Sequence, residues 1–170
     1  MDDTAAIRAC RAGNPDAFRH FVDRYQSRAL AHARLLTRHE ADAADATQEA
    51  FVDAFRNLRT FDPERPFYAW FYVLLRNRCF KQQSRRGTRS ESGTVPDSAV
   101  RPGVSEAGLD LWRAIGRLSP GDAELIVLKH LEEWTYEELS KALGIPRGTV
   151  MSRLFTARQR LLANLSGESS

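Results

Sequence analysis

The stretch from residue 135 to 162 most constrains the fold, because it holds the start and turn signals of a helix-turn-helix within a short space. Thr135 and Glu138 form a capping-box pattern, in which a hydroxyl and a carboxylate each satisfy a backbone N–H at a helix start. The Gly-Ile-Pro run at 144–146 then ends that helix. Glycine tolerates the left-handed conformation at a helix end, and proline readily opens the next helix. The sequence therefore predicts two consecutive helices joined by a three-residue turn.

The second of these helices combines an apolar stripe with a face that is suited to DNA. Apolar side chains recur along it at helical period: Val150, Leu154, Ala157, Leu161 and Leu165. No acidic residue occurs from Arg147 to Arg160, and the arginines lie toward the flanks of the stripe. The outer face can then meet base edges in a major groove while the arginines meet phosphates.

A solvated amphipathic helix is the plainer interpretation of such a pattern. Here the capping box, the turn and the segregation of charge occur together, so the sequence favours binding to duplex DNA. The predicted contacts are Tyr136, Arg147, Thr149, Met151, Ser152, Arg153, Phe155, Thr156, Arg158 and Gln159.

The first half of the chain also shows helical patterns throughout. Asn14 and Pro15 predict a helix start, and apolar residues follow at helical spacing: Phe18, Val22, Tyr25, Ala29, Ala33 and Leu36. A second helix is predicted at about 40–58, burying Ala44, Phe51, Ala54, Phe55 and Leu58. Its polar side carries Asp42, Asp45, Gln48, Glu49, Asp53 and Arg56. That side is either merely solvated or a docking surface for a basic or mixed-charge partner.

The loop at 61–66 contains two prolines, which cannot lie inside a helix, and an unusual helix is predicted after it at 67–83. Six aromatic residues fall within 61–72, and a basic track follows from Arg76. One helix face cannot bury all of these rings. Rings beside cations suit single-stranded nucleic acid, because each base stacks on a ring at about 1–3 kcal/mol while the cations follow the backbone. We assign Phe67, Trp70, Phe71 and Leu74 to the core and expect contact from Tyr68, Tyr72, Asn77 and the basic side chains.

Residues 84–108 are rich in Gly, Ser, Pro and Arg and nearly lack large apolar residues, which predicts a flexible linker. About 25 residues of extended chain can span on the order of 80 Å. Two further helices are predicted after it, and they supply core side chains beneath the helix-turn-helix: Leu111, Trp112, Ile115, Leu118, Leu125, Ile126, Leu128 and Leu131. The predicted fold class is therefore all-α. Two small helical domains, at 1–83 and 109–165, flank the linker, and residues 166–170 form a disordered tail.

Composition and spacing exclude several classes of function, because the sequence lacks metal-ligand, membrane-spanning and catalytic patterns. The 25 basic and 22 acidic residues leave a net charge of only +3, so the placement of charge is more informative than its sum. Cys10 and Cys79 lie far apart and the four histidines form no pair with ligand spacing, so we expect no metal and no cofactor. No signal peptide or membrane-length apolar run occurs, which predicts a soluble cytoplasmic protein without membrane insertion. We expect no catalytic residues, because no nucleophile–base pair or phosphate-cradling loop is present.

Three stretches together resemble a bacterial RNA polymerase sigma factor of the extracytoplasmic-function (ECF) group, within the sigma-70 family. They read DAADATQEAFVDAFRNLRTFD at 42–62, FYAWFYVLLRNRCFKQQSRR at 67–86 and LSPGDAELIVLKHLEEWTYEELSKALGIPRGTVMSRLFTARQRL at 118–161. The resemblance covers about residues 10–165. It implies two helical domains, called regions 2 and 4, that direct core RNA polymerase to promoters and help open the DNA.

This resemblance also implies roles for the predicted surfaces. The polymerase-docking residues, which face the clamp coiled coil of the largest polymerase subunit, would be Asp45, Gln48, Glu49, Asp53 and Arg56. The residues that read the minus-ten element on the non-template single strand would be Phe61, Asp62, Glu64, Arg65, Tyr68, Tyr72, Arg76, Asn77 and Lys81. The helix-turn-helix would read the minus-thirty-five element as a duplex. An anti-sigma protein, which can sit at the inner membrane face, is the implied regulator.

The sequence departs from the pattern of this family in two places, the recognition helix and the loop at 61–66. Related recognition helices often carry basic side chains where Met151 and Thr156 stand, so contact with thymine methyl groups through Met151 and Phe155 gains weight. The loop at 61–66 is acidic and proline-rich where small residues are common. Two alternatives remain open: a stand-alone helix-turn-helix regulator, and a helical interaction protein without a DNA role.

Overall fold

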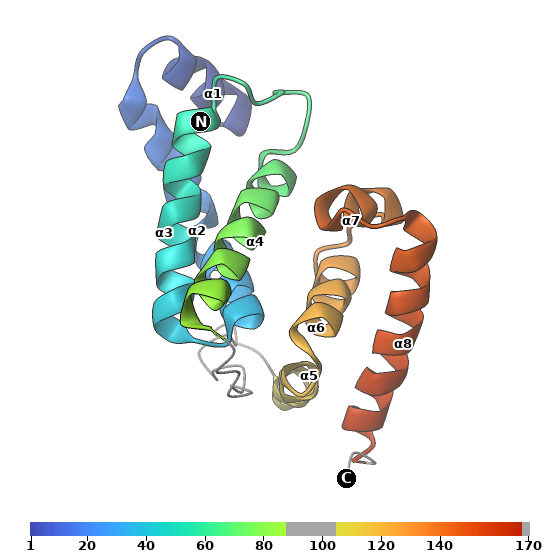
Figure 1. Cartoon of the computed structure of the whole chain (residues 1–170). Helices are drawn as coiled ribbons and strands as arrows, with labels where there is room; N and C mark the ends of the chain where they lie inside the picture. The colour runs from blue at the N-terminus through green and yellow to red at the C-terminus, as the bar shows by residue number, and fades with distance from the viewer. Residues whose placement is uncertain (88–104, 168–170) are drawn as a thin grey trace.

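The computed structural model describes residues 1–87 and 105–167 (Figure 1), so most of the predicted linker and the end of the predicted tail lie outside the described residues. Every regular element within those ranges is a helix, as predicted. The helices pack as two groups, with α4 of the first group beside α6 and α7 of the second (Figure 1). Two linker bounds differ from the prediction, because α4 includes residues 84–86 and α5 includes residues 106–108.

The first group consists of α1 (Asp3–Arg11), the 3-10 turn η1 (Pro15–Phe18), α2 (Arg19–Thr37), α3 (Glu40–Asn57) and α4 (Phe67–Arg86). Asn14 caps η1 through its side chain, and Pro15 occupies the first position, as the sequence indicated. Rings from α2 and α4 stack in the core, with Phe21 and Phe67 centroids 4.1 Å apart. These aromatic contacts fix α4 against α2.

Helix α1, which the sequence did not predict, is attached to α2 by one carboxylate. Asp3 accepts hydrogen bonds from Arg24 (3.1 Å) and from the Tyr25 hydroxyl (2.5 Å), and it pairs with His20 at 2.8 Å. Burial and the bond to Asp3 raise the pKa of Tyr25 to about 12, so its hydroxyl remains a donor.

The second group consists of α5 (Glu106–Gly116), α6 (Pro120–Ile126), the π-helical turn η3 (Val127–Leu131), α7 (Tyr136–Leu143) and α8 (Arg147–Leu165). Ser119 caps α6 by accepting from the Asp122 backbone N–H, with Pro120 at the first position. The fully buried side chains Ile115, Leu125, Leu128 and Leu139 form the core beneath α8.

Four apolar residues that we predicted to be buried are exposed instead. Ala44 and Phe55 lie at an open groove between α2 and α3, where no further element covers them. Leu131 lies at the end of η3 and Leu165 in the last turn of α8, so both extend past the packed part of their helices. Helical period places a residue on a face, but it does not reveal whether another element covers that face.

Candidate nucleic-acid interfaces

The helix-turn-helix has the predicted local geometry. Thr135 Oγ1 accepts from the Glu138 backbone N–H at 3.1 Å, and the Glu138 carboxylate accepts from the Thr135 N–H at 2.7 Å, which completes the capping box. Gly144 ends α7 in the left-handed region at φ 64°. The Ser140 hydroxyl donates to the Ile145 carbonyl at 2.6 Å, which holds the turn closed.

Helix α8 buries its stripe and exposes the residues predicted to meet bases. Val150, Leu154 and Ala157 are fully buried, whereas Met151 is 48% exposed and Phe155 is 63% exposed. The other predicted residues exposed on α8 are Arg147, Thr149, Ser152, Arg153, Thr156 and Gln159. The outer face therefore has an apolar and hydroxyl-bearing centre with arginines beside it.

Two predicted contacts of this domain also interact within it. Arg158 is half-buried and its Nε donates to His130 Nε2 at 3.0 Å. Burial, with the charges of Arg158 and Lys129, lowers the pKa of His130, so the ring accepts this bond in its neutral form. Tyr136 is half-buried, with the Lys129 ammonium 4.5 Å and the Arg147 guanidinium 5.8 Å from its ring centre.

The predicted minus-ten residues divide into an exposed and a buried set. Asp62, Glu64, Arg65, Asn77 and Lys81 are exposed, and Arg76 is half-buried. Phe61, Tyr68 and Tyr72 are buried. Burial of the two tyrosines differs from the expectation that they contact DNA. Tyr72 is covered by Glu124 and Trp134 of the second group of helices, whereas Tyr68 is covered by Tyr25 and His32 of α2. Trp70 and Leu74, which we assigned to the core, are only half-buried against it.

Sequence reasoning missed the residue that braces the minus-ten loop. The Arg11 guanidinium donates to the carbonyl oxygens of Phe61 and Leu58, and the Leu58 bond measures 3.2 Å. Within the loop, Asp62 accepts from the Glu64 backbone N–H at 3.0 Å. Nothing in the local pattern around Arg11 indicates this long-range role.

The predicted docking residues on α3 also divide into two sets. Asp45, Gln48 and Arg56 are exposed. Glu49 and Asp53 are half-buried, because Arg78 of α4 binds Asp53 through two bonds of 2.5 and 2.6 Å and Glu49 through one of 3.2 Å. These hydrogen bonds raise the pKa of Arg78. Asp53 therefore fastens α3 to α4.

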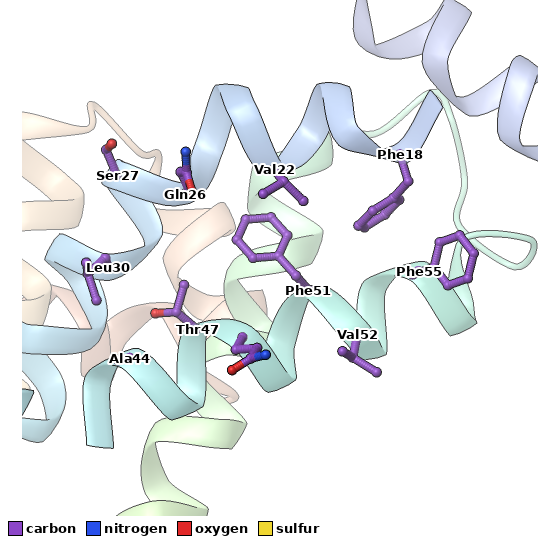
Figure 2. Close-up of a pocket in the computed structure, with 11 residues that line it drawn as sticks. Phe18, Val22, Gln26, Ser27, Leu30, Ala44, Thr47, Phe51, Val52 and Phe55 are labelled. Carbon is purple, nitrogen blue, oxygen red and sulfur yellow. The ribbon is translucent and has the colours of Figure 1, made fainter. Parts of the chain in front are cut away.

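An apolar groove of about 660 Å³ runs between α2 and α3 beside the exposed docking residues. Figure 2 shows Phe51 and Val22 between the two helices, with Phe18 and Phe55 at one end. Val52 is 42% exposed and Phe55 46% exposed at its edge, next to Gln48. The sequence indicated only the polar part of this surface, because Phe55 was assigned to the core.

The described residues contain no group of three or more His, Cys, Asp or Glu that could hold a metal ion. Both cysteines are free, and burial raises the pKa of the Cys79 thiol to about 12. Among the helices at 1–87 and 105–167, none is long and apolar enough to cross a bilayer.

Family comparisons match both groups of helices. Sigma-70 region 2 matches residues 21–89, and Sigma-70, region 4 matches residues 108–161. The two regions in this order define a sigma-70-type architecture. Among solved structures, CnrH in complex with the cytosolic domain of CnrY is 30% identical, with a TM-score of 0.68 over 98% of this chain and 99% of that chain. The sigma factor RpoE of Bartonella quintana, in complex with the anti-sigma factor NepR, shares the fold at a TM-score of 0.70 and 24% identity, over 90% of this chain and 98% of that one.

Relatives extend the match over nearly the whole chain. The ECF RNA polymerase sigma factor SigW of Bacillus subtilis is 30% identical over 94% of this chain and 94% of its own length. The ECF RNA polymerase sigma-E factor of Haemophilus influenzae is 29% identical over 95% and 94%. The chain belongs to the ECF RNA polymerase sigma factors. It is a promoter-directing sigma factor, and the match of both regions excludes the stand-alone regulator.

Proposed function

We propose that this sigma factor binds core RNA polymerase through α3 and the groove beside it. The observation that carries the proposal is the open groove of about 660 Å³, edged by the exposed apolar side chains of Val52 and Phe55. A helix that lays its apolar face into such a groove buries that surface, and polar residues around the rim fix its register. The proposed occupant is the clamp coiled coil of the largest polymerase subunit, which is the helical partner that the family resemblance implies. Asp45, Gln48 and Arg56 supply the polar rim.

In the same proposal, Glu49 and Asp53 act indirectly. Their carboxylates hold Arg78, so they set the position of α3 on α4. The exposed part of the docking surface is therefore smaller than the polar face of α3 suggests.

Promoter DNA is the second proposed partner. Helix α8 binds it as a duplex, and α4 with the preceding loop at 61–66 binds the non-template single strand. Exposed arginines beside Met151 and Phe155 support the duplex assignment, since phosphates position a helix and groove contacts read the bases. Exposed Asn77 and Lys81 on α4 and the exposed loop residues Asp62, Glu64 and Arg65 support the single-strand assignment. Phe61 then supports the loop from inside, because it lies in the core.

An anti-sigma protein is the proposed regulator, because ECF sigma factors are commonly held inactive by such a partner. CnrH, a structural relative, is in complex with the cytosolic domain of CnrY. We place the chain in the cytoplasm, where polymerase works, and assign it no catalytic residue or cofactor, because polymerase performs the synthesis.

Docking is tested by Val52→Glu in a pull-down with core polymerase. A charge in the apolar groove should lower the affinity at least about tenfold, since an unpaired charge must then be desolvated. Leu165→Glu is the matched control, because Leu165 has similar exposure at 47% but lies on α8. Equal loss of affinity in both variants would contradict the assigned surface.

The complete function is tested by run-off transcription with bacterial core polymerase on a pool of promoter fragments with varied minus-thirty-five and minus-ten elements. Initiation from a defined subset, only when the protein is present, is the expected result. No initiation from any fragment, together with no association with core polymerase, would overturn the proposal.

A further inference from the structure

The π-helical turn η3 contacts both helices of the helix-turn-helix. Its first residues, Val127 and Leu128, are buried in the core of region 4. The Glu132 backbone N–H donates to the Val127 carbonyl at 3.0 Å, which is the wider hydrogen-bonded ring of a π turn. Single π turns within helices occur frequently at functional sites. Here the adjacent residues Lys129 and His130 reach two different helices, because Lys129 contacts α7 and His130 contacts α8.

His130 holds Arg158 by one edge of its guanidinium. In the part of the chain that the structure describes, Arg158 makes a side-chain hydrogen bond only through Nε, to His130 Nε2 at 3.0 Å. The two Nη groups carry the remaining N–H donors, so they can serve a DNA phosphate at the same time. Arg158 lies two turns after Met151 and therefore borders the exposed face of α8. A side chain that is already held in one rotamer loses less conformational entropy when it binds.

The bond depends on the protonation state of His130, because an imidazole nitrogen accepts only while it carries no proton. The charged groups that act on the ring are the cations Arg158 of α8 and Lys129 of η3 itself. Carboxylates of the neighbouring elements are engaged elsewhere: Asp122 with Arg160, Glu124 with Arg76, Glu132 with Arg28, Glu137 with Lys141, and Glu138 with the Thr135 N–H. Protonation of His130 would therefore place it as a third cation beside Arg158 and break the bond.

We propose that His130 is a positioning residue for duplex recognition, which holds Arg158 toward a DNA phosphate while the imidazole is neutral and releases it when the imidazole is protonated. Lys129 anchors the same turn, because its Nζ donates to the Trp134 carbonyl at 3.0 Å. The DNA part of this inference rests on the proposed function, whereas the bond between His130 and Arg158 concerns the free protein alone.

Nitrogen NMR of the histidine rings tests the bond in the full chain without DNA. In wild type the neutral His130 ring should carry its proton on Nδ1, because Nε2 is the acceptor. Arg158→Gln should raise the pKa of His130 toward its ordinary value of about 6.5, since a neighbouring cation is removed. His20, which pairs with Asp3 in region 2, is the internal control and should titrate alike in both proteins. An unchanged tautomer and titration of His130 in Arg158→Gln would overturn the bond.

Fluorescence anisotropy tests the positioning role, with a duplex selected for binding to the wild-type protein. Arg158→Gln should weaken binding about tenfold at about pH 7.5 but at most about threefold at about pH 5, where His130 is protonated. His130→Gln keeps an acceptor that does not titrate, so in that background Arg158→Gln should cost about tenfold at both pH values. Far-UV circular dichroism verifies that each variant keeps its helices at both pH values.

Arg153→Gln is the matched control, because Arg153 is exposed on the same helix and has no hydrogen bond to a histidine among the described residues. Its cost should be the same at both pH values. An equal cost of Arg158→Gln at both pH values overturns the positioning role and leaves the proposed function standing. A pH-dependent cost that persists in the His130→Gln background also overturns it. The expected pattern, in a protein that directs no transcription, supports the positioning role and refutes the proposed function instead.

Discussion

Replacement of Phe155 by Ala should weaken duplex binding about tenfold without changing its salt dependence. A fully covered aromatic side chain buries about 150–250 Å², and Phe155 is 63% exposed in the free protein. About 120 Å² thus remains for DNA to cover, which at about 25 cal/mol per Å² gives at most about 3 kcal/mol. Coverage of half this area in an open groove gives about 1.5 kcal/mol, or about tenfold in Kd.

The assay is fluorescence anisotropy with a duplex that carries the minus-thirty-five element selected in the run-off pool. Each duplex is measured with thymine and with uracil, which lacks the C5 methyl group. Loss of the methyl groups should weaken wild-type binding and affect Phe155→Ala less, with a coupling of roughly 0.5–1 kcal/mol.

Arg153→Gln serves as the contrasting variant, because Arg153 lies beside the same face and carries charge. It should reduce the slope of log K against log salt by about one, whereas Phe155→Ala should leave that slope unchanged. An equal effect of uracil on wild type and Phe155→Ala would refute methyl readout through this ring.

Three further outcomes are expected. Leu154→Ala, at a fully buried position of α8, should destabilise region 4 by about 2–5 kcal/mol and abolish duplex binding. Leu162→Ala, at an exposed position of the same helix, should change the stability little. Thermal melting followed by circular dichroism measures both variants. Asp53→Asn should cost on the order of 1 kcal/mol, roughly 4–8 °C in the Tm of region 2, and an unchanged Tm would show that Arg78 does not fasten α3 to α4. Because the pKa of His130 is lowered in the folded protein, the unfolded chain takes up its proton first, so stability should fall as pH drops below about 6.5; His130→Gln should remove this part of the pH dependence in denaturant titrations.

The sequence predicted the elements of this fold well wherever local rules decide them. The capping box at Thr135, the glycine end at Gly144 and the proline start at Pro120 depend on neighbours within a turn of helix, and all three are confirmed. The recurrence of apolar residues at helical period along α2, α3 and α8 likewise predicted three helices. The first helix, α1, was missed, although the side chain of Asp2 caps it.

Site geometry was predictable only in part, because burial depends on residues that are distant in sequence. Tyr68 is covered by side chains of α2 and Tyr72 by side chains of region 4, and no property of residues 67–83 reveals either cover. Phe55 was expected inside the protein since it follows the apolar period of α3, yet α2 and α3 leave a groove there. Arg11 reaches the loop before α4 across nearly fifty residues of sequence, beyond any local pattern.

Because the groove between α2 and α3 is open, the lifetime of this chain depends on whether a partner occupies the groove. Apolar surface that faces water makes no favourable contribution to folding. Region 2 alone therefore has a lower free energy of unfolding than it has when a partner covers the groove. A partner that fills it stabilises the folded state by mass action, about 2.7 kcal/mol at a hundred times its Kd. The melting temperature should therefore rise with partner concentration, and free molecules should be degraded faster than bound ones. Partners that compete for the groove should therefore determine how much of the sigma factor escapes degradation, as well as which complex it joins.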